Sequence, residues 1–173
     1  NPPEGTPTDP TPPKDPSESE TTPTPSKPGD GMNVPEGYTY RWTLDGNTLV
    51  LVQYKNSNPC STDLEFPTGG RYKIGDRLLN NDAYGAYING IVIPDDVIAI
   101  GKGAFQDVTI FNLDAKMYEL TIPQSVAVIG EYAFAQTAIT KLTLKGNYSA
   151  GKIGESAFAG CMMLENVVFE GTI

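Results

Sequence analysis

The sequence has 173 residues, a formal net charge of −9 and no histidine, and these properties exclude several classes of function. Without histidine, the chain has no Ser-His-Asp or Cys-His nucleophile and no histidine-containing zinc site. The acidic charge is spread along the chain with no basic patch, which argues against nucleic acid and anionic lipid surfaces as partners. Two cysteines, Cys60 and Cys161, are too few for a disulfide framework or a thiolate zinc site. We therefore expect neither cofactor nor metal.

Residues 1–31 differ from the rest of the chain in composition. They hold ten of the fifteen prolines and no large hydrophobic residue. Such a segment cannot bury enough apolar surface to offset the entropy of ordering the chain, so we predict a disordered linker that leans toward polyproline II. The N-terminus shows no charged and apolar regions of an export signal, and no apolar run is long enough to span a bilayer. We expect any export signal to have been removed already.

A β-hairpin is predicted after this linker. Residues 38–44 and 48–53 alternate between apolar and polar side chains around Asp45-Gly46-Asn47, and this turn sequence tolerates positive φ. Tyr40 and Trp42 fall on one face of the hairpin. We interpret that face as core packing at the N-terminal end of the following domain, with a ligand-stacking platform as the alternative.

The segment that follows the hairpin has a weaker pattern. Residues 55–87 contain many turn formers, and we predict irregular structure there with one short strand at 71–74. Residues 32–85 are thus expected to form a hairpin cap and an irregular segment.

Internal repetition dominates the rest of the chain. The motif Ile-Gly-x-x-Ala-Phe occurs at Ile100–Phe105, Ile129–Phe134 and Ile153–Phe158. Alternating apolar stretches, typical of half-buried strands, lie around these motifs at 88–93, 117–122, 139–144 and 164–169. A single helical or 3₁₀ turn is expected around each Ala-Phe pair, because alanine favours helix and no longer helical pattern occurs.

Energetics require these repeats to stack. Six buried side chains contribute on the order of 10–15 kcal/mol, at about 1.5–3 kcal/mol each. Ordering roughly 24 backbone units costs on the order of 24–48 kcal/mol. One repeat cannot fold alone, so its neighbours must cover its core, as in a solenoid.

The repeat resembles the BspA-like class of leucine-rich repeat, which is common in surface proteins of Bacteroidetes and some other microbes. Residues 94–105 and 123–134 match the pattern IPxxVxxIGxxAF without gaps, and Phe158, Cys161, Leu164 and Val167 match its second half. The stretch 42–51 is similar to the hairpin that often opens such proteins. The resemblance implies a mostly β fold with a right-handed solenoid and a concave sheet over 86–173.

Some positions depart from the pattern. An insertion occurs near Asp107–Lys116, and Thr137 stands where the pattern has cysteine. Cys161 is expected to be a small buried hydrophobe, whereas nothing in the sequence decides the state of Cys60. Ile173 falls where another turn would begin, so we expect an exposed sheet edge unless the last strand caps itself, a partner covers it or residues are missing.

Two apparent catalytic signals are interpreted as accidental. Asp95 and Asp96 are adjacent on a turn and point in different directions, unlike the facing carboxyl groups of a glycosidase. Gly146–Lys152 fits GxxxxGK, but Ile153 stands where a phosphate-binding loop needs serine or threonine. We therefore expect no enzymatic activity.

The expected function is binding or adhesion at the cell surface, to a protein or a glycan. Solenoids present a rigid surface built from the variable positions of their strands. From alternation alone, the candidate binding residues are Tyr118, Glu119, Thr121, Lys141, Thr143, Glu165 and Asn166. The alternative is a structural role in which exposed solenoid ends join copies or a larger surface complex. The linker resembles the spacer of an exported lipoprotein, which implies an extracytoplasmic location and a lipid anchor upstream of Asn1.

Overall fold

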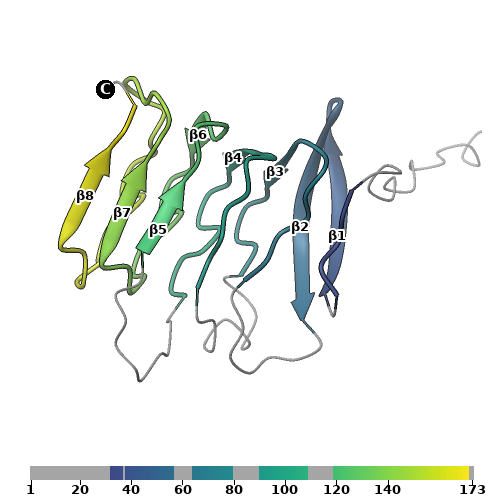
Figure 1. Ribbon diagram of the computed structural model, residues 1–173, viewed down its shortest axis with the longest axis horizontal. Helices are drawn as coiled ribbons and strands as arrows, with labels where there is room; N and C mark the ends of the chain where they lie inside the picture. The colour runs from purple at the N-terminus through teal and green to yellow at the C-terminus, as the bar shows by residue number, and fades with distance from the viewer. Residues whose placement is uncertain (1–31, 37, 57–63, 80–89, 109–118, 172–173) are drawn as a thin grey trace, which may run out of the picture.

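The computed structural model describes residues 32–36, 38–56, 64–79, 90–108 and 119–171. These residues form eight strands and contain no helix. The strands are β1 (Tyr38–Asp45), β2 (Thr48–Asn56), β3 (Tyr72–Ile74), β4 (Val97–Ile100), β5 (Glu119–Ile122), β6 (Val128–Ile129), β7 (Lys141–Leu144) and β8 (Asn166–Phe169). They lie in a row from β1 at one end to β8 at the other (Figure 1). The predicted linker at 1–31 lies outside the described residues.

The strands form two sheets on different sides of a solenoid of about four turns. One sheet has the order β1-β2-β3-β4-β6, and the other has the order β5-β7-β8. All neighbouring strands are parallel except β1 and β2, which form the predicted antiparallel hairpin. Parallel order follows from the coiling, because each turn brings the chain back in the same direction one strand farther along. The mostly β solenoid predicted from the sequence is confirmed.

The middle turn places one strand in each sheet, whereas the next turn continues the first sheet only as an isolated bridge from Ile129 to Ile153. In the middle turn, β5 ends at Ile122, Pro123 starts the corner, and β6 follows before Gly130 begins the next corner. Proline suits this corner because its missing N–H falls just after a strand. Sequence analysis predicted the strands of the three-stranded sheet but did not predict that β4 and β6 pair with each other.

One turn begins earlier than the sequence pattern indicated. Ile74-Gly75 pairs with Ile100-Gly101 through β3 and β4, and the Gly101 amide donates to the Ile74 carbonyl at 2.9 Å. Leu79 likewise donates to Ala104 at 3.0 Å. The segment read as irregular therefore contains a stacked turn around the predicted short strand, with Leu78 and Leu79 in place of Ala-Phe. The domain limits at 31/32 and 85/86 stay a prediction.

The glycines of the repeat let successive turns approach closely. A Cβ built on Gly130 lies 2.6 Å from the Gly101 carbonyl carbon, and one on Gly154 lies 2.6 Å from the Gly130 carbonyl carbon. A Cβ on Gly101 meets Gly75 in the same way, at 2.6 Å. Any side chain here would push two turns apart, which explains why glycine recurs at this position.

The corner after each Ile-Gly pair is a series of turns and not the predicted helical or 3₁₀ turn. In every described turn, the residue two positions after the glycine of the Ile-Gly pair has positive φ. These residues are Arg77, Gly103, Tyr132 and Ser156. A further left-handed residue follows at Asp107, Gln136 and Gly160. Left-handed residues interrupt a helix. The need to reverse the chain within a few residues therefore outweighs the helix propensity of the alanine. Amide groups of the corner instead bond to the next turn, as from Phe134 to Ala157 at 2.7 Å.

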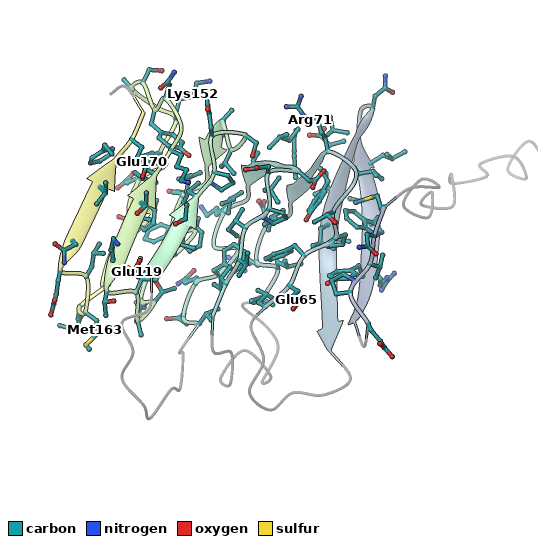
Figure 2. The ribbon with its side chains drawn as sticks, in the orientation of Figure 1. Glu65, Arg71, Glu119, Lys152, Met163 and Glu170 are labelled. Atoms are coloured by element: carbon teal, nitrogen blue, oxygen red, sulfur yellow. The ribbon has the colours of Figure 1, made fainter. Side chains whose placement is uncertain are left out.

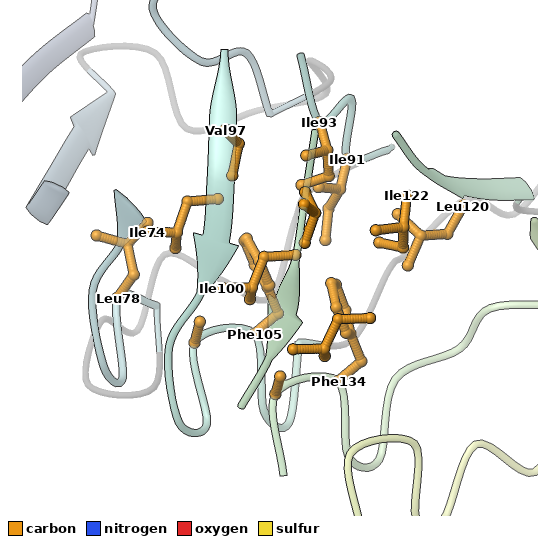
Figure 3. Close-up of a cluster of buried hydrophobic side chains, with 14 of the residues drawn as sticks. Ile74, Leu78, Ile91, Ile93, Val97, Ile100, Phe105, Leu120, Ile122 and Phe134 are labelled. Atoms are coloured by element: carbon orange, nitrogen blue, oxygen red, sulfur yellow. The ribbon is translucent and has the colours of Figure 1, made fainter. Parts of the chain in front are cut away.

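The hydrophobic core fills the space between the two sheets (Figure 3). The phenylalanines of the repeat stack as a ladder, with ring centroids 4.9 Å apart from Phe105 to Phe134 and 5.4 Å apart from Phe134 to Phe158. Both Phe105 and Phe134 are completely buried. The repeated aromatic position therefore forms one continuous core that crosses the turn boundaries, as stacking requires.

The hairpin closes the N-terminal end of this core. Trp42 is buried and meets the Tyr72 ring edge-on at 5.1 Å. The Tyr40 hydroxyl donates to the Glu65 carbonyl at 2.7 Å. Trp42 is therefore a core residue, as the first interpretation held, and is not an exposed stacking platform.

Ion pairs join neighbouring turns on the outside. A hydrogen bond from Lys73 at 2.7 Å lowers the pKa of Asp45, which is on the hairpin. Farther along, the hydrogen bond to Glu131 raises the pKa of Lys102. Both pairs are exposed to solvent, so each contributes little to the stability of the fold.

Candidate functional site

Six of the seven predicted binding residues lie in or beside the three-stranded sheet; Tyr118 lies outside the described residues. The register aligns Glu119 with Lys141 and Asn166, and it aligns Thr121 with Thr143. The neighbours Leu120 and Leu142 are buried, so the aligned residues face outward. Alternation along each strand therefore places these residues on one surface.

This surface, which we call the outer face, consists of three rows across β5, β7 and β8. Its members are Glu119, Lys141 and Asn166 in the first row, Thr121, Thr143 and Val168 in the middle row, and Lys145 and Glu170 in the third row, where Pro123, which follows β5, is buried. Sequence analysis missed Val168, Lys145 and Glu170. Continuing the same alternation to the strand ends and using the register would have found them.

The charged groups of the outer face are paired across strands. The Lys141 ammonium lies 2.9 Å from the Glu119 carboxylate, and the Lys145 ammonium lies 3.9 Å from the Glu170 carboxylate. Figure 2 shows Glu119 on β5 and Glu170 at the far end of β8. Lys141 begins the central strand β7 and pairs with Glu119 of β5, whereas Lys145 directly follows β7 and pairs with Glu170, which directly follows β8. The two pairs therefore lie at diagonally opposite corners, on either side of the uncharged middle row.

Glu165 directly precedes β8, and a backbone hydrogen bond to the neighbouring turn holds it in place. The amides of Glu165 and Asn166 both donate to the Thr140 carbonyl, at 2.9 Å and 3.2 Å. Both side chains are exposed. The structure thus places the described candidates of the sequence analysis in or directly beside the same three-stranded sheet.

The side chains of β8 that point toward the core are only partly covered. Val167 and Phe169 align with the buried Leu142 and Leu144, yet each is 47% exposed. Met162 and Met163, in the corner before β8, are exposed as well. These exposed apolar side chains lie on β8 and just before it, and β8 has a described strand on one side only.

The described part of the chain holds no cluster of side chains arranged as a metal site. Among these residues, no group of three or more Cys, Asp or Glu side chains is placed to hold a metal. Cys161 is partly buried, and its thiol donates to the Phe134 carbonyl at 3.2 Å and contacts the Thr137 hydroxyl at 3.4 Å. Thr137 thus occupies the cysteine position of its turn. The described residues form no helix, and hence no helix that is long and apolar enough to cross a membrane.

Residues 146–152, which resemble a phosphate-binding loop, serve the core instead. Tyr148 is buried at the position held by Val126 in the previous turn, and its ring packs over Gly146. Its hydroxyl has no hydrogen-bond partner among the described residues. Burial raises the pKa of Tyr148 to about 12. The loop is therefore a lengthened corner of the solenoid.

The stacked strands, the close-packed glycines and the phenylalanine ladder define a leucine-rich-repeat solenoid. The family model described as "BspA type Leucine rich repeat region" matches residues 77–173 in six copies, and the chain belongs to this family. The chain is also similar to a solved leucine-rich cell surface protein from Faecalibacterium prausnitzii, at 19% sequence identity and a TM-score of 0.31. That match covers 81% of this chain and 55% of the other. A search of curated proteins found no match.

Proposed function

We propose that this protein is a cell-surface binding module that contacts a protein or glycan through the outer face. The observation that carries the proposal is the register of β5, β7 and β8, which collects outward residues from three separate turns onto one surface. Each turn can vary its outward residues without disturbing the core, because inward and outward positions alternate. Membership in a repeat family whose modules typically mediate interactions supports this reading.

The module acts by binding and not by catalysis. Its location is extracytoplasmic, because the BspA-type repeat is associated with cell surfaces and the proline-rich segment 1–31 has the composition of a spacer. A lipid anchor upstream of Asn1 completes the proposal. In an exported lipoprotein the lipid is attached to a cysteine, which would lie before Asn1 in this protein. Mass spectrometry of the protein extracted from cell envelopes tests for it, and an N-terminal peptide without lipid would count against the anchor.

Blocking the outer face tests the binding role. Thr143→Arg places a large cation at its centre, whereas Thr43→Arg places the same group at an exposed position of the other sheet. The wild-type chain and both variants are compared on immobilised extracellular proteins and on a glycan array. We expect Thr143→Arg to abolish a signal that Thr43→Arg retains. Equal signals from both variants would contradict the proposal.

A second candidate function is assembly through the solenoid end. The exposed Val167, Phe169 and Met162 on and before β8 favour it, because large apolar side chains exposed close together in the sequence are candidates for a contact site. Light scattering over a range of protein concentrations tests self-assembly. A monomer at the highest concentration would exclude this alternative and leave the binding role untouched.

A further inference from the structure

The charges on the outer face limit which partners it accepts. Lys141 and Lys145 already contact Glu119 and Glu170 within the same sheet, so the four charges cancel locally. A charged ligand would have to displace one member of an existing pair and leave the other alone, which offsets the new attraction. The uncharged groups of the middle row remain available to a ligand. They are the hydroxyls of Thr121 and Thr143 and the side chain of Val168, which is 38% exposed.

The same charges disfavour a second copy of the chain on this face. Consider a second copy whose outer face meets this one across a two-fold axis that lies in the plane of the face and passes through Thr143. The axis can run along the strands, along the rows or along either diagonal of the face. In these arrangements Lys141 faces Lys141 or Lys145 of the other copy, or a glutamate faces a glutamate. Like charges in contact cost free energy, so the outer face is not self-complementary about its centre.

The size of the face selects between the remaining classes of partner. Three strands about 4.8 Å apart, each four residues long at about 3.3 Å per residue, give an outer face of roughly 200 Å². A stable interface with a folded protein buries about 800 Å² on each side. The outer face is therefore too small for a folded partner but matches a short, chain-like ligand.

We propose that the outer face binds a neutral oligosaccharide that lies across β5, β7 and β8 along the middle row. This inference rests on the proposed binding role of the same face. Threonine hydroxyls both donate and accept hydrogen bonds, as sugar hydroxyls require, and Val168 offers apolar contact to the C–H side of a sugar ring. The length of one sugar in an extended chain is close to the spacing of the strands, so successive sugars meet successive strands. A flat surface of this size binds weakly, with a Kd of about 1 mM.

Calorimetric titration of the full chain tests the inference. The neutral probes are cello-, laminari- and manno-oligosaccharides, and the anionic probe is an oligogalacturonate. We expect at least one neutral probe to bind with an affinity that changes less than about twofold between roughly 50 and 500 mM salt, since no charge is exchanged. Oligogalacturonate should bind more weakly. A steep salt dependence, or preference for the anionic probe, would overturn the inference.

A matched pair of variants locates the ligand. Thr143→Val removes one hydroxyl of the middle row at nearly constant shape, and Thr43→Val removes one from the other sheet. We expect Thr143→Val to lower the affinity about 2–10-fold, the equivalent of one hydrogen bond. Thr43→Val should leave the affinity unchanged.

The outcomes separate this inference from the proposed function. If no neutral probe binds while Thr143→Arg still abolishes binding to an extracellular protein, the inference is wrong and the binding role stands. If Thr143→Arg changes no binding of any kind, both are wrong.

Discussion

Strands β7 and β8 carry the same inward pattern but differ sharply in burial. Leu142 and Leu144 of β7 are 2% and 1% exposed, whereas the aligned Val167 and Phe169 of β8 are each 47% exposed. β7 has a strand on both sides, and β8 has a described strand on one side only. Burial of a repeat position is thus decided by the neighbouring turns, and the stability of the solenoid resides in the contacts between turns.

The largest expected effect comes from the phenylalanine ladder. Phe134 is completely buried between two stacked rings, and Phe158 is partly exposed and has one described ring neighbour. We expect Phe134→Ala to lower the free energy of unfolding by about 3–5 kcal/mol, because loss of the ring leaves a cavity in the core. Phe158→Ala should cost clearly less. Denaturant unfolding measures both, and equal losses would contradict the contrast between covered and partly covered turns.

The next effect tests how closely the turns approach. Gly130→Ala places a methyl group 2.6 Å from the backbone of Gly101, so the turns must separate. We expect a loss of about 1–3 kcal/mol, as for other overpacked sites. The exposed Ala127→Ser on the same turn serves as the control, with a change within about 0.5 kcal/mol. A Gly130→Ala protein as stable as the control would show that the turns have room to spare.

Two buried tyrosines provide a matched comparison. The Tyr72 hydroxyl donates to the Pro67 carbonyl at 2.9 Å, whereas the Tyr148 hydroxyl has no partner among the described residues. Tyr72→Phe should cost about 1 kcal/mol, since it removes a hydrogen bond and leaves a carbonyl unpaired. Tyr148→Phe should cost nothing or stabilise the fold. Thermal and denaturant unfolding decide, and a larger loss for Tyr148→Phe would show that its hydroxyl is bonded.

The same tyrosines set the alkaline limit of stability. Burial raises the pKa of Tyr148 from 10.0 to about 12, and burial with the nearby Asp96 raises that of Tyr72. The folded state therefore keeps these protons while the unfolded chain loses them. Stability should be complete below pH 10 and fall as the pH rises toward 12. In Tyr148→Phe this fall should be shallower, which unfolding curves at successive pH values will show.

The smallest effect concerns backbone strain in the corners. Ser156 has φ of 56°, a conformation that costs a non-glycine residue about 1–2 kcal/mol. Ser156→Gly removes this strain but adds about 0.5–1 kcal/mol of chain entropy, so a net gain of up to about 1 kcal/mol is expected. Ala157→Gly, at a neighbour without positive φ, should instead destabilise the protein. If both variants lose stability, the left-handed corner carries no strain.

Local signals in the sequence predicted much of the fold. The hairpin was predicted because Asp45-Gly46-Asn47 favours a tight turn between alternating strands. The strand ends of the three-stranded sheet followed from period-two alternation. The turn at Ile74-Gly75 was missed because Leu78-Leu79 replaces Ala-Phe, so the segment matches the repeat only once its pairing with β4 is known.

The candidate site was predicted as a set of positions and not as a surface. Alternation identified Glu119 and Lys141 as outward residues, but their pairing depends on a register between strands 22 residues apart in the chain. The same holds for Lys145 and Glu170, whose pairing makes the outer face electrically neutral. Register is a property of neighbouring turns, and a single-sequence pattern does not contain it.

The amino-acid sequence by itself determined that the chain forms a BspA-type solenoid, because the spacing of Ile, Gly, Ala and Phe dictates which side chains face inward and where a turn can pack closely. Only the tertiary structure decided the second sheet at β4 and β6, the left-handed corners and the cross-strand ion pairs. The physical reason is that the first set depends on the local period of the chain. The second set depends on contacts between turns, which exist only after stacking.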